Sequence, residues 1–328
     1  MIQKKLKIGV IGAGHLGKYH INHLSSHSDI YFVGFFDSDA ENAKAVEKKF
    51  SVKSFESIDE LIQEADAVHI VTPTTFHHEI AIKCLNENKD IFIEKPITST
   101  TAEAQEIIAL GEVKKRIVQV GHIERFNPTI NKLKKVVSSP HYIEIERLAP
   151  FQVRGTEVPV VLDLMVHDID LIVSMVDSDI QDIHASGAKM MSETVDLAHA
   201  HIKFKNGVVA NLKSSRIAQN YVRKIRTYEK DLYSITDLMI PQIELYGLKK
   251  TDIFSSKSIQ QKIDTSSGAK NLLYEKIIPD KIDALLEEIN NFINCIGSRK
   301  PPIVDGKQGL KALEIALDIE NKIIKNGS

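Results

Sequence analysis

The first third of the chain alternates short apolar runs with segments of helical spacing. Apolar runs cover residues 7–13, 30–37, 67–73, 90–96 and 116–122, and helical patterns cover residues 16–26, 39–50, 57–65, 76–88 and 100–115. Strands that are apolar on both faces and alternate with helices are typical of a parallel sheet covered by helices. We therefore predict an α/β domain with a doubly wound parallel sheet over residues 1–123.

The pattern changes after residue 123. Residues 141–149 alternate apolar and polar side chains, and residues 198–215 form two such runs around Asn206-Gly207, a strong hairpin signal. The alternation continues through residues 222–238 and 241–247, whereas residues 158–176, 283–297 and 309–325 have helical spacing. We predict that residues 124–328 form an α+β domain for substrate binding and oligomerisation, built on a large, mostly antiparallel sheet.

Composition narrows the class of protein. The chain has 328 residues, enough for two domains, and it is 43% hydrophobic and 26% charged with a net charge of −2. A net charge this close to zero gives no strong electrostatic attraction to nucleic acid or to an acidic membrane. No apolar run is long enough to cross a membrane. The first residues make a poor signal peptide because glycines interrupt their apolar run. Cys84 and Cys295 form no CxxC motif, so we expect reduced thiols in a cytoplasmic protein.

A glycine-rich loop of the form G-x-G-x-x-G follows the first apolar run. Gly12 permits a tight turn, Gly14 lets the backbone approach a pyrophosphate, and Gly17 allows close packing of helix on strand. The helix that begins with His15 and Leu16 offers free N–H groups and a partial positive charge to the diphosphate. The loop therefore predicts a dinucleotide site.

Other cofactor candidates stand where the next apolar runs end. Asp37 would accept hydrogen bonds from a ribose 2′-OH and repel a 2′-phosphate, which favours NAD over NADP. Thr72, Pro73 and Thr74 would lie at the carboxyl edge of the sheet, where doubly wound folds bind ligands. His77 opens the following helix, where it either packs against the helix start or contacts cofactor or substrate.

Four motifs in order resemble those of the Gfo/Idh/MocA family of glucose-fructose and inositol-type dehydrogenases: GVIGAGHLGKYH, TPTTFH, EKP and DLMVHDID. The resemblance covers nearly the whole chain. It implies that Lys95 lies beside the nicotinamide, where its ammonium can hydrogen-bond the reacting oxygen and take part in proton transfer. It also implies that Glu94 orients its neighbours and that the bond between Lys95 and Pro96 is cis.

The same resemblance assigns roles on the helical segment 158–176. Asp163, His167 and Asp170 are spaced to share one face of a helix, whereas Asp168 points elsewhere. By the family match, His167 takes the proton of the substrate hydroxyl, and Asp163 orients it or binds a neighbouring hydroxyl. A metal site would use the same spacing, but no further His or Cys motif supports one; a capped helix with an interior histidine is the other alternative. Many members have a glycine run before this Asp, so EVPVVLDLMVHDID points to a subgroup.

The segment VGHIERFNP, residues 120–128, resembles a subgroup that oxidises nucleotide-linked amino sugars, such as UDP-N-acetylglucosamine 3-dehydrogenases. We expect it to border the cleft where the substrate binds. Arginine suits a substrate phosphate or carboxylate because its planar fork donates two hydrogen bonds, although a salt bridge is the alternative for each arginine. Besides Asp163 and His167, the substrate candidates are His122, Glu124, Arg125, Asn127, Arg154 and Arg216.

The sequence thus predicts an NAD-dependent dehydrogenase that transfers a hydride from a hydroxyl carbon of a sugar, with a UDP-N-acetylglucosamine-like substrate. An enzyme acting on a free polyol such as inositol, and a non-catalytic NAD(H)-binding regulator, are the alternatives. Retention of Lys95, Asp163 and His167 at matching positions argues against the regulator. The resemblance also implies a homodimer or homotetramer that assembles through the antiparallel sheet.

Overall fold

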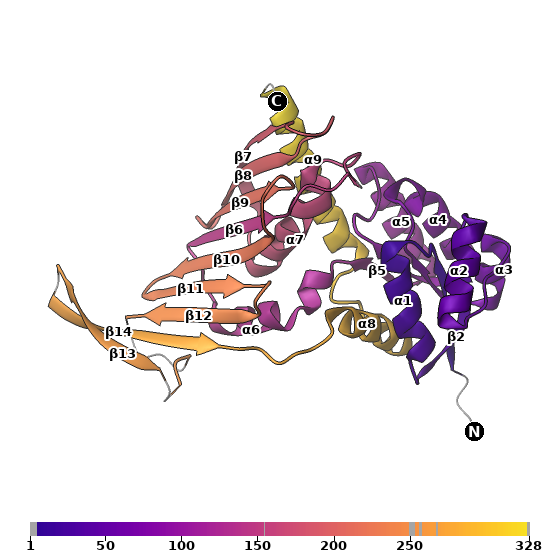
Figure 1. Ribbon diagram of the computed structural model, residues 1–328, viewed down its shortest axis with the longest axis horizontal. Helices are drawn as coiled ribbons and strands as arrows, with labels where there is room; N and C mark the ends of the chain where they lie inside the picture. Colours follow the sequence, from indigo (N-terminus) through magenta and orange to yellow (C-terminus); the bar gives the residue numbers. More distant parts are fainter. Residues whose placement is uncertain (1–4, 154, 249–252, 256–257, 267, 327–328) are drawn as a thin grey trace. The chain divides into compact units, whose positions relative to one another are not determined.

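The computed structural model describes residues 5–153, 155–248, 253–255, 258–266 and 268–326 (Figure 1). Its contacts divide the chain into two compact units, Met1–Ile123 with Asp283–Leu313, and Glu124–Ile282 with Glu314–Ser328. The predicted second domain, residues 124–328, includes residues 283–313, whereas their contacts place them in the first unit. This segment therefore corrects the predicted division.

The first unit contains a parallel sheet of five strands in the order β2-β1-β3-β4-β5. The strands are β1 (Leu6–Ile11), β2 (Ile30–Phe36), β3 (Ala67–Ile70), β4 (Asp90–Glu94) and β5 (Val118–Gly121). Strands β3, β4 and β5 are buried along their whole length, as their uninterrupted apolar runs predict. The doubly wound sheet of the prediction is confirmed.

Most helices of this unit begin at a short polar residue that caps them. Asp39 accepts hydrogen bonds from two N–H groups of α2, Ser57 accepts one from α3, and Thr100 forms a capping box with Glu103 of α5. Helix α1 differs, because its first residue follows Gly14 and no side chain caps it. The helices are α1 (His15–Ser26), α2 (Ala40–Phe50), α3 (Ile58–Glu64), α4 (His77–Asn86), α5 (Thr101–Lys114) and α8 (Ala284–Ser298).

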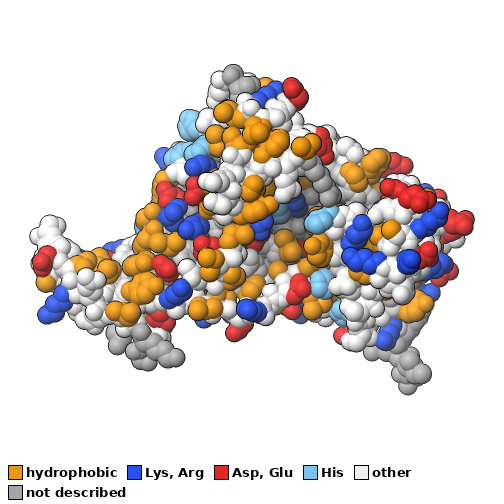
Figure 2. Space-filling model, viewed as in Figure 1, with side chains coloured by type: hydrophobic (Ala, Val, Ile, Leu, Met, Phe, Trp, Pro, Cys, Tyr) orange, Lys and Arg blue, Asp and Glu red, His pale blue; other side chains and the backbone are white. Residues whose placement is uncertain are grey.

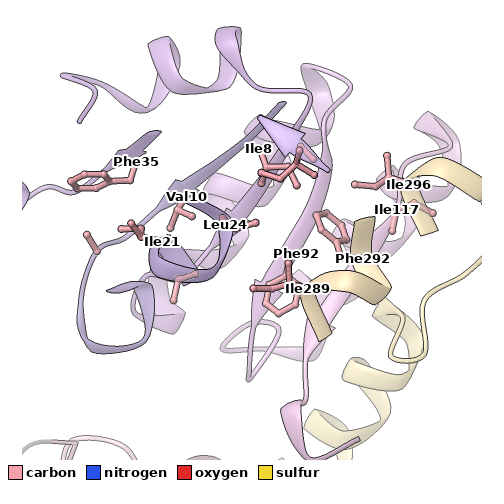
Figure 3. Packing of buried hydrophobic residues seen from close by; sticks show 14 of the residues in the cluster. Ile8, Val10, Ile21, Leu24, Phe35, Phe92, Ile117, Ile289, Phe292 and Ile296 are labelled. Atoms are coloured by element: carbon pink, nitrogen blue, oxygen red, sulfur yellow. The ribbon is translucent and has the colours of Figure 1, made fainter. Parts of the chain in front are cut away.

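Helix α8 explains why residues 283–313 belong to the first unit. Its residues Ile289, Phe292 and Ile296 join the same buried cluster as Ile8 and Phe92 of the parallel sheet (Figure 3). The rings of Phe92 and Phe292 meet edge to face, with centroids 6.0 Å apart. The sequence pattern predicts the apolar face of this helix, but it does not tell which of two sheets the face covers.

The second unit contains a sheet of nine strands in the order β13-β14-β12-β11-β10-β6-β9-β8-β7. Neighbouring strands are antiparallel except for the parallel pair β6 and β9, so the predicted mostly antiparallel sheet is confirmed. Gly207 has a φ of 91° in the turn between β8 and β9, which is the predicted hairpin. The strands are β6 (Tyr142–Leu148), β7 (Ile180–Ala188), β8 (Leu197–Phe204), β9 (Val209–Ser215), β10 (Val222–Glu229), β11 (Leu232–Asp237), β12 (Gln242–Gly247), β13 (Ile259–Thr265) and β14 (Gly268–Ile277).

One face of this sheet is buried and the other is open. Along β6, Ile143 and Ile145 are buried, whereas Glu144 and Glu146 between them are half-buried. Helices α6 (Pro128–Val136) and α7 (Val166–Met175) pack against the sheet, and α9 (Gly306–Lys325) is the last helix of the chain. Within the described parts of the chain, no helix has the length and apolar character needed to cross a membrane.

Candidate active site

The glycine loop between β1 and α1 uses its three glycines in different ways. Gly12 has a φ of 97°, and a Cβ added there would lie 2.4 Å from the carbonyl oxygen of Val71. A Cβ added at Gly17 would lie 2.1 Å from the carbonyl oxygen of Gly12. A Cβ added at Gly14 would meet nothing within 4 Å. The absence of a Cβ at Gly12 and Gly17 therefore permits the close backbone packing of the loop, whereas Gly14 faces open space.

The start of α1 is suited to an anion. Gly14 is its N-cap residue and makes no side-chain cap, and the first turn contains no acidic residue. His15 and Leu16 of this turn are exposed. Uncapped N–H groups and the positive end of the helix dipole favour a phosphate at such a position. The open space at Gly14 and the uncapped helix start together fit the pyrophosphate of a dinucleotide.

Asp37, just after β2, fixes the glycine loop. Its Oδ2 accepts a hydrogen bond from the backbone N–H of Ala13 at 2.7 Å and one from Nδ2 of Asn42 at 3.2 Å. Its Oδ1 accepts one from the N–H of Asp39 at 2.9 Å. A carboxylate offers about four lone-pair positions, so this half-buried group can still accept a bond from a ribose hydroxyl.

The segment after β3 is tied to the segment after β4 by His77. Its ring is buried, with Nε2 2.9 Å from the carbonyl oxygen of Thr72 and Nδ1 3.0 Å from that of Pro96. Burial lowers the pKa of His77, and the hydrogen bonds to these two carbonyls oppose that effect. The buried ring thus belongs to the packing at the start of α4. Pro73 and Thr74 lie between β3 and α4, and Thr74 begins a 3-10 turn.

Glu94 and Lys95 end strand β4. The bond between Lys95 and Pro96 is cis, as the family resemblance implies. Glu94 is buried; its Oε2 accepts a hydrogen bond from the backbone N–H of Lys95 at 3.2 Å, and its Oε1 lies 3.0 Å from Nε2 of His20. Burial alone would raise the pKa of Glu94, but the hydrogen bond from His20 and the charge and backbone hydrogen bond of Lys95 lower it below its usual range. The side chain of Lys95 itself is partly exposed.

In the second unit, the segment with Asp163 and His167 is not one α-helix. Residues Val161–Met165 form a π-helical turn, in which the N–H groups of Leu162 and Asp163 both approach the carbonyl oxygen of Pro159 at 3.0 Å. Helix α7 with His167 follows this turn. The predicted common face assumed α-helical spacing throughout, and the wider turn before residue 166 changes that spacing for Asp163. Such turns are rare and occur often at functional sites.

Two buried ion pairs hold the residues beside His167. Asp168 accepts hydrogen bonds from Arg147 of β6, and Asp170 lies 3.1 Å from Nε of Arg125. All four side chains are buried. Asp168 therefore points into the unit, where it has a structural partner, while His167 is half-buried. Both pairs anchor α7 through positions that follow His167 in the sequence.

The remaining substrate candidates of this unit have partners of their own. Glu124 accepts a hydrogen bond from Nη1 of Arg147 at 3.1 Å and one from Nδ2 of Asn127 at 2.9 Å. Arg216 is buried, donates to the carbonyl oxygens of Gly155, Val158 and Val195, and lies 3.4 Å from Asp196. Arg125 and Arg216 thus make salt bridges, as the alternative for these arginines predicted, but the pairs are buried rather than at a surface or interface. His122, in the first unit, is buried, and Arg154 lies outside the described residues.

Sequence reasoning missed Arg147, His20 and His69. A signal existed for two of them. Arg147 occupies an apolar-face position in the alternation of residues 141–149, and His20 falls on the buried face of α1 with Gly17 and Leu24. A polar side chain at such a position is buried and needs a partner. Among the described residues, no three His, Cys, Asp or Glu side chains group closely enough to hold a metal ion.

Comparison with known proteins decides the family. Residues 6–122 match the model of an oxidoreductase family with an NAD-binding Rossmann fold, and residues 151–234 match the C-terminal domain of the same family. A UDP-N-acetylglucosamine 3-dehydrogenase of Acidithiobacillus ferrooxidans is 33% identical over 315 residues, 96% of each chain. The chain belongs to the Gfo/Idh/MocA family of oxidoreductases.

Other comparisons place this family member among dehydrogenases. A solved structure of the Acidithiobacillus ferrooxidans UDP-N-acetylglucosamine 3-dehydrogenase superposes with a TM-score of 0.87 at 33% identity, covering 97% of each chain. A myo-inositol 2-dehydrogenase of Thermotoga maritima is 26% identical over 332 residues, 94% of this chain and 93% of that one. These Gfo/Idh/MocA relatives are dehydrogenases of a nucleotide sugar and of a polyol, and this protein is an oxidoreductase of the same family.

Proposed function

We propose that this protein is an NAD-dependent dehydrogenase of a nucleotide-linked amino sugar, with UDP-N-acetylglucosamine oxidised at carbon 3 as the leading candidate. The similarity to a UDP-N-acetylglucosamine 3-dehydrogenase carries the proposal, because 33% identity extends over 96% of both chains. The segment with Glu124, Arg125 and Asn127 resembles the same subgroup, as part of this similarity. We also propose a cytoplasmic location, which suits the two free and buried cysteines.

The cofactor would be held by the first unit. The backbone at Gly14 and the uncapped start of α1 would bind the pyrophosphate, and Asp37 would accept a hydrogen bond from the adenosine ribose. A 2′-phosphate would meet the charge of the Asp37 carboxylate, which supports NAD rather than NADP. When bound, the nicotinamide supplies the chemistry of hydride acceptance from the substrate carbon.

His167 and Lys95 would have different roles at the substrate hydroxyl. His167 would take the hydroxyl proton, because an imidazole titrates close to neutral pH and can act as acid or base. Lys95 would hydrogen-bond the reacting oxygen and stabilise the negative charge that develops on it. Asp163, in the π-helical turn before α7, would orient His167 or bind a neighbouring hydroxyl.

A free polyol is the second candidate substrate. The similarity to a myo-inositol 2-dehydrogenase extends over 94% of this chain and supports this candidate, although the identity is lower, 26%. A non-catalytic regulator is supported less, because it would have little use for Lys95, Asp163 and His167 together.

The test compares substrates directly. Formation of reduced cofactor would be followed with UDP-N-acetylglucosamine, UDP-glucose, myo-inositol and free N-acetylglucosamine, each with NAD⁺ and with NADP⁺. Turnover only with the amino-sugar nucleotide is the expected result. Turnover of myo-inositol alone would support the proposed dehydrogenase chemistry but contradict the proposed nucleotide-sugar substrate. If no turnover is seen, the denatured protein is assayed for tightly held NAD(H). A protein that neither retains NAD(H) nor binds added NAD(H) would contradict the proposal.

We further propose that the protein forms a homo-oligomer through the open face of the nine-stranded sheet. Five tyrosines stand in register across this face, each paired with the next on a neighbouring strand, with ring centroids 4.8 to 5.8 Å apart. We call Tyr142, Tyr228, Tyr233, Tyr246 and Tyr274 the tyrosine row. In Figure 2, hydrophobic side chains form a stripe over the ends of β10, β11 and β12. A row of half-exposed aromatic rings suits an interface with a second copy.

A charge placed in the row tests this assembly. Tyr233→Glu should shift the protein to a monomer in light scattering, since a buried, unpaired carboxylate opposes association. Val113→Glu, on an exposed position of α5, is the control and should leave the mass unchanged. An unchanged mass for Tyr233→Glu would contradict the proposed interface.

A further inference from the structure

Two buried histidines of the first unit form a chain that ends on Glu94. Nε2 of His20 lies 3.0 Å from Oε1 of Glu94, and Nδ1 of His20 lies 3.0 Å from Nδ1 of His69. His20 is 1% exposed and His69 is 0% exposed. The ring of His69 stacks on Phe92, with centroids 4.6 Å apart and an interplanar angle of 6°, and meets Phe292 edge to face at 5.2 Å. These contacts hold His69 in one orientation.

Proton counting assigns the hydrogen bonds of this chain. A close contact between two Nδ1 atoms needs one proton, which one ring donates and the other accepts. The ionised carboxylate of Glu94 only accepts, so His20 donates from Nε2. If Nε2 of His69 carries no proton, the shared proton of the two Nδ1 atoms belongs to His69, which donates to Nδ1 of His20. Nε2 of His69 has no hydrogen-bond partner among the described residues, which suits a bare nitrogen better than a buried N–H. Burial lowers the pKa of His69 well below its usual range, which keeps this ring neutral.

The chain leads to the backbone of Lys95. Oε2 of Glu94 accepts the hydrogen bond from the N–H of Lys95 at 3.2 Å. On its other side the carboxylate faces Gly121, where an added Cβ would lie 3.0 Å from both carboxylate oxygens. His20, Gly121 and the N–H of Lys95 thus leave Glu94 little freedom, and a shift of the carboxylate would move the backbone that carries the Lys95 side chain.

We propose that His69 and His20 are positioning residues, which fix the orientation of Glu94 and thereby the place of Lys95 in the reaction. The inference rests on the proposed catalytic role of Lys95. A displacement of about 1 Å in a reacting group can cost about 10²-fold in rate, so a residue two contacts away can matter for catalysis without touching the substrate.

The protonation pattern can be measured without activity. Long-range ¹H–¹⁵N spectra of the imidazole rings should show His69 neutral and protonated on Nδ1, and His20 protonated on Nε2. The His69→Asn variant assigns the signals. A His69 protonated on Nε2, or a ring that exchanges between tautomers, would overturn the proposed chain.

Variants of His69 then test positioning. His69→Leu removes the donor to His20, and kcat should fall about 10- to 100-fold on the substrate that turns over, while KM and the Kd for NADH change by less than about threefold. His69→Asn places an amide donor near the position of Nδ1 and should recover kcat to within about threefold of wild type. Phe292→Leu is the control, because it contacts the same ring without hydrogen bonding and should lower Tm but not kcat.

The outcomes separate this inference from the proposed function. If Lys95→Ala lowers kcat and folded His69→Leu does not, the positioning role is wrong and the proposed function stands. If Phe292→Leu lowers kcat as much as His69→Leu, the effect is one of packing and the inference is also wrong. If Lys95→Ala keeps full activity, the proposed role of Lys95 fails, and with it the catalytic part of the inference, whatever the spectra show.

Discussion

Arg147 donates hydrogen bonds to the carboxylate of Asp168 from Nε at 2.9 Å and from Nη2 at 2.8 Å, and both side chains are buried. Asp168 directly follows His167 in α7, and Arg147 also donates to Glu124. The strand β6 thus holds the helix of the proposed base through a two-bond contact that lysine could not reproduce. The charge of Arg147 is balanced by two buried carboxylates.

Loss of Arg147 should therefore destabilise the second unit. Arg147→Leu leaves Asp168 and Glu124 buried without their cation, and breaking a buried pair in this way costs about 3–5 kcal/mol. Urea unfolding at neutral pH measures the loss. Lys213→Ala removes the more exposed pair with Glu146 and should cost at most about 1 kcal/mol. Equal losses for the two variants would show that the buried network contributes no more than a surface pair.

Gly14 and Gly17 give a matched test of the glycine loop. Gly14→Ala should keep Tm, because the residue has a φ of −65° and open space for a Cβ, but it should weaken NADH binding at least about tenfold by blocking the approach of the pyrophosphate. Gly17→Ala should lower Tm, since its Cβ would lie 2.1 Å from a backbone oxygen. Fluorescence titration and thermal melting measure both, and unchanged binding by Gly14→Ala would place the cofactor elsewhere.

Asp37 should set the choice between NAD and NADP. Asp37→Asn retains an acceptor oxygen for the N–H of Ala13 but loses the negative charge. We expect the ratio of kcat/KM for NAD⁺ to that for NADP⁺ to fall at least about tenfold, mainly through NADP⁺, because a like charge no longer opposes the 2′-phosphate. Asp39→Asn, at the neighbouring helix cap, is the control and should leave the ratio unchanged. A ratio unaffected by Asp37→Asn would contradict this role.

Asp196 should make stability depend on acid pH. Burial alone would raise its pKa, but hydrogen bonds from Ser192 and from the N–H groups of Met190 and Met191 lower the pKa to about 2. Because the unfolded pKa is higher, about 3.9, the stabilisation is complete above that pH and is lost as the pH falls towards about 2. Allowing for solvent screening, we expect about 1–2 kcal/mol.

The Asp196→Asn variant isolates this contribution. Its unfolding free energy should be lower than that of wild type at pH values near neutral, and the two curves should converge as the pH falls from about 4 to about 2. Urea unfolding across this range provides the measurement. A constant difference at all pH values would mean that the hydrogen bonds act without the charge of the carboxylate.

The sequence predicted those parts of the fold that depend on local pattern. Period-two alternation and the turn at Gly207 predicted the antiparallel sheet, and apolar runs predicted the parallel one. The pattern could not predict that Phe292 packs on Phe92, because helical spacing defines an apolar face but not its partner. It also missed the π-helical turn Val161–Met165, because the pattern assumed α-helical spacing through Asp163.

The sequence predicted the parts of the candidate site in which a motif determines the backbone conformation. It predicted less well which partners the side chains of the site would contact. Gly12 and Gly17 have the tight contacts that their spacing predicts, and the cis bond at Pro96 accompanies the EKP motif. The planar fork of Arg216 suits a substrate phosphate or carboxylate, and the sequence alone predicts no more than this. Which carboxylate or carbonyl it meets depends on residues distant in sequence, such as Asp196, and on the fold that brings them close.

The most direct test of the central claim measures single-turnover reduction of NAD⁺ by UDP-N-acetylglucosamine in wild type, Lys95→Ala and His167→Ala. Loss of a positioned acid or base usually costs about 10²- to 10⁴-fold in rate, so both variants should fall in that range while NADH binding persists. His201→Ala, on an exposed position of β8, is the control and should retain the wild-type rate. Wild-type rates in both Lys95→Ala and His167→Ala would contradict the proposed mechanism.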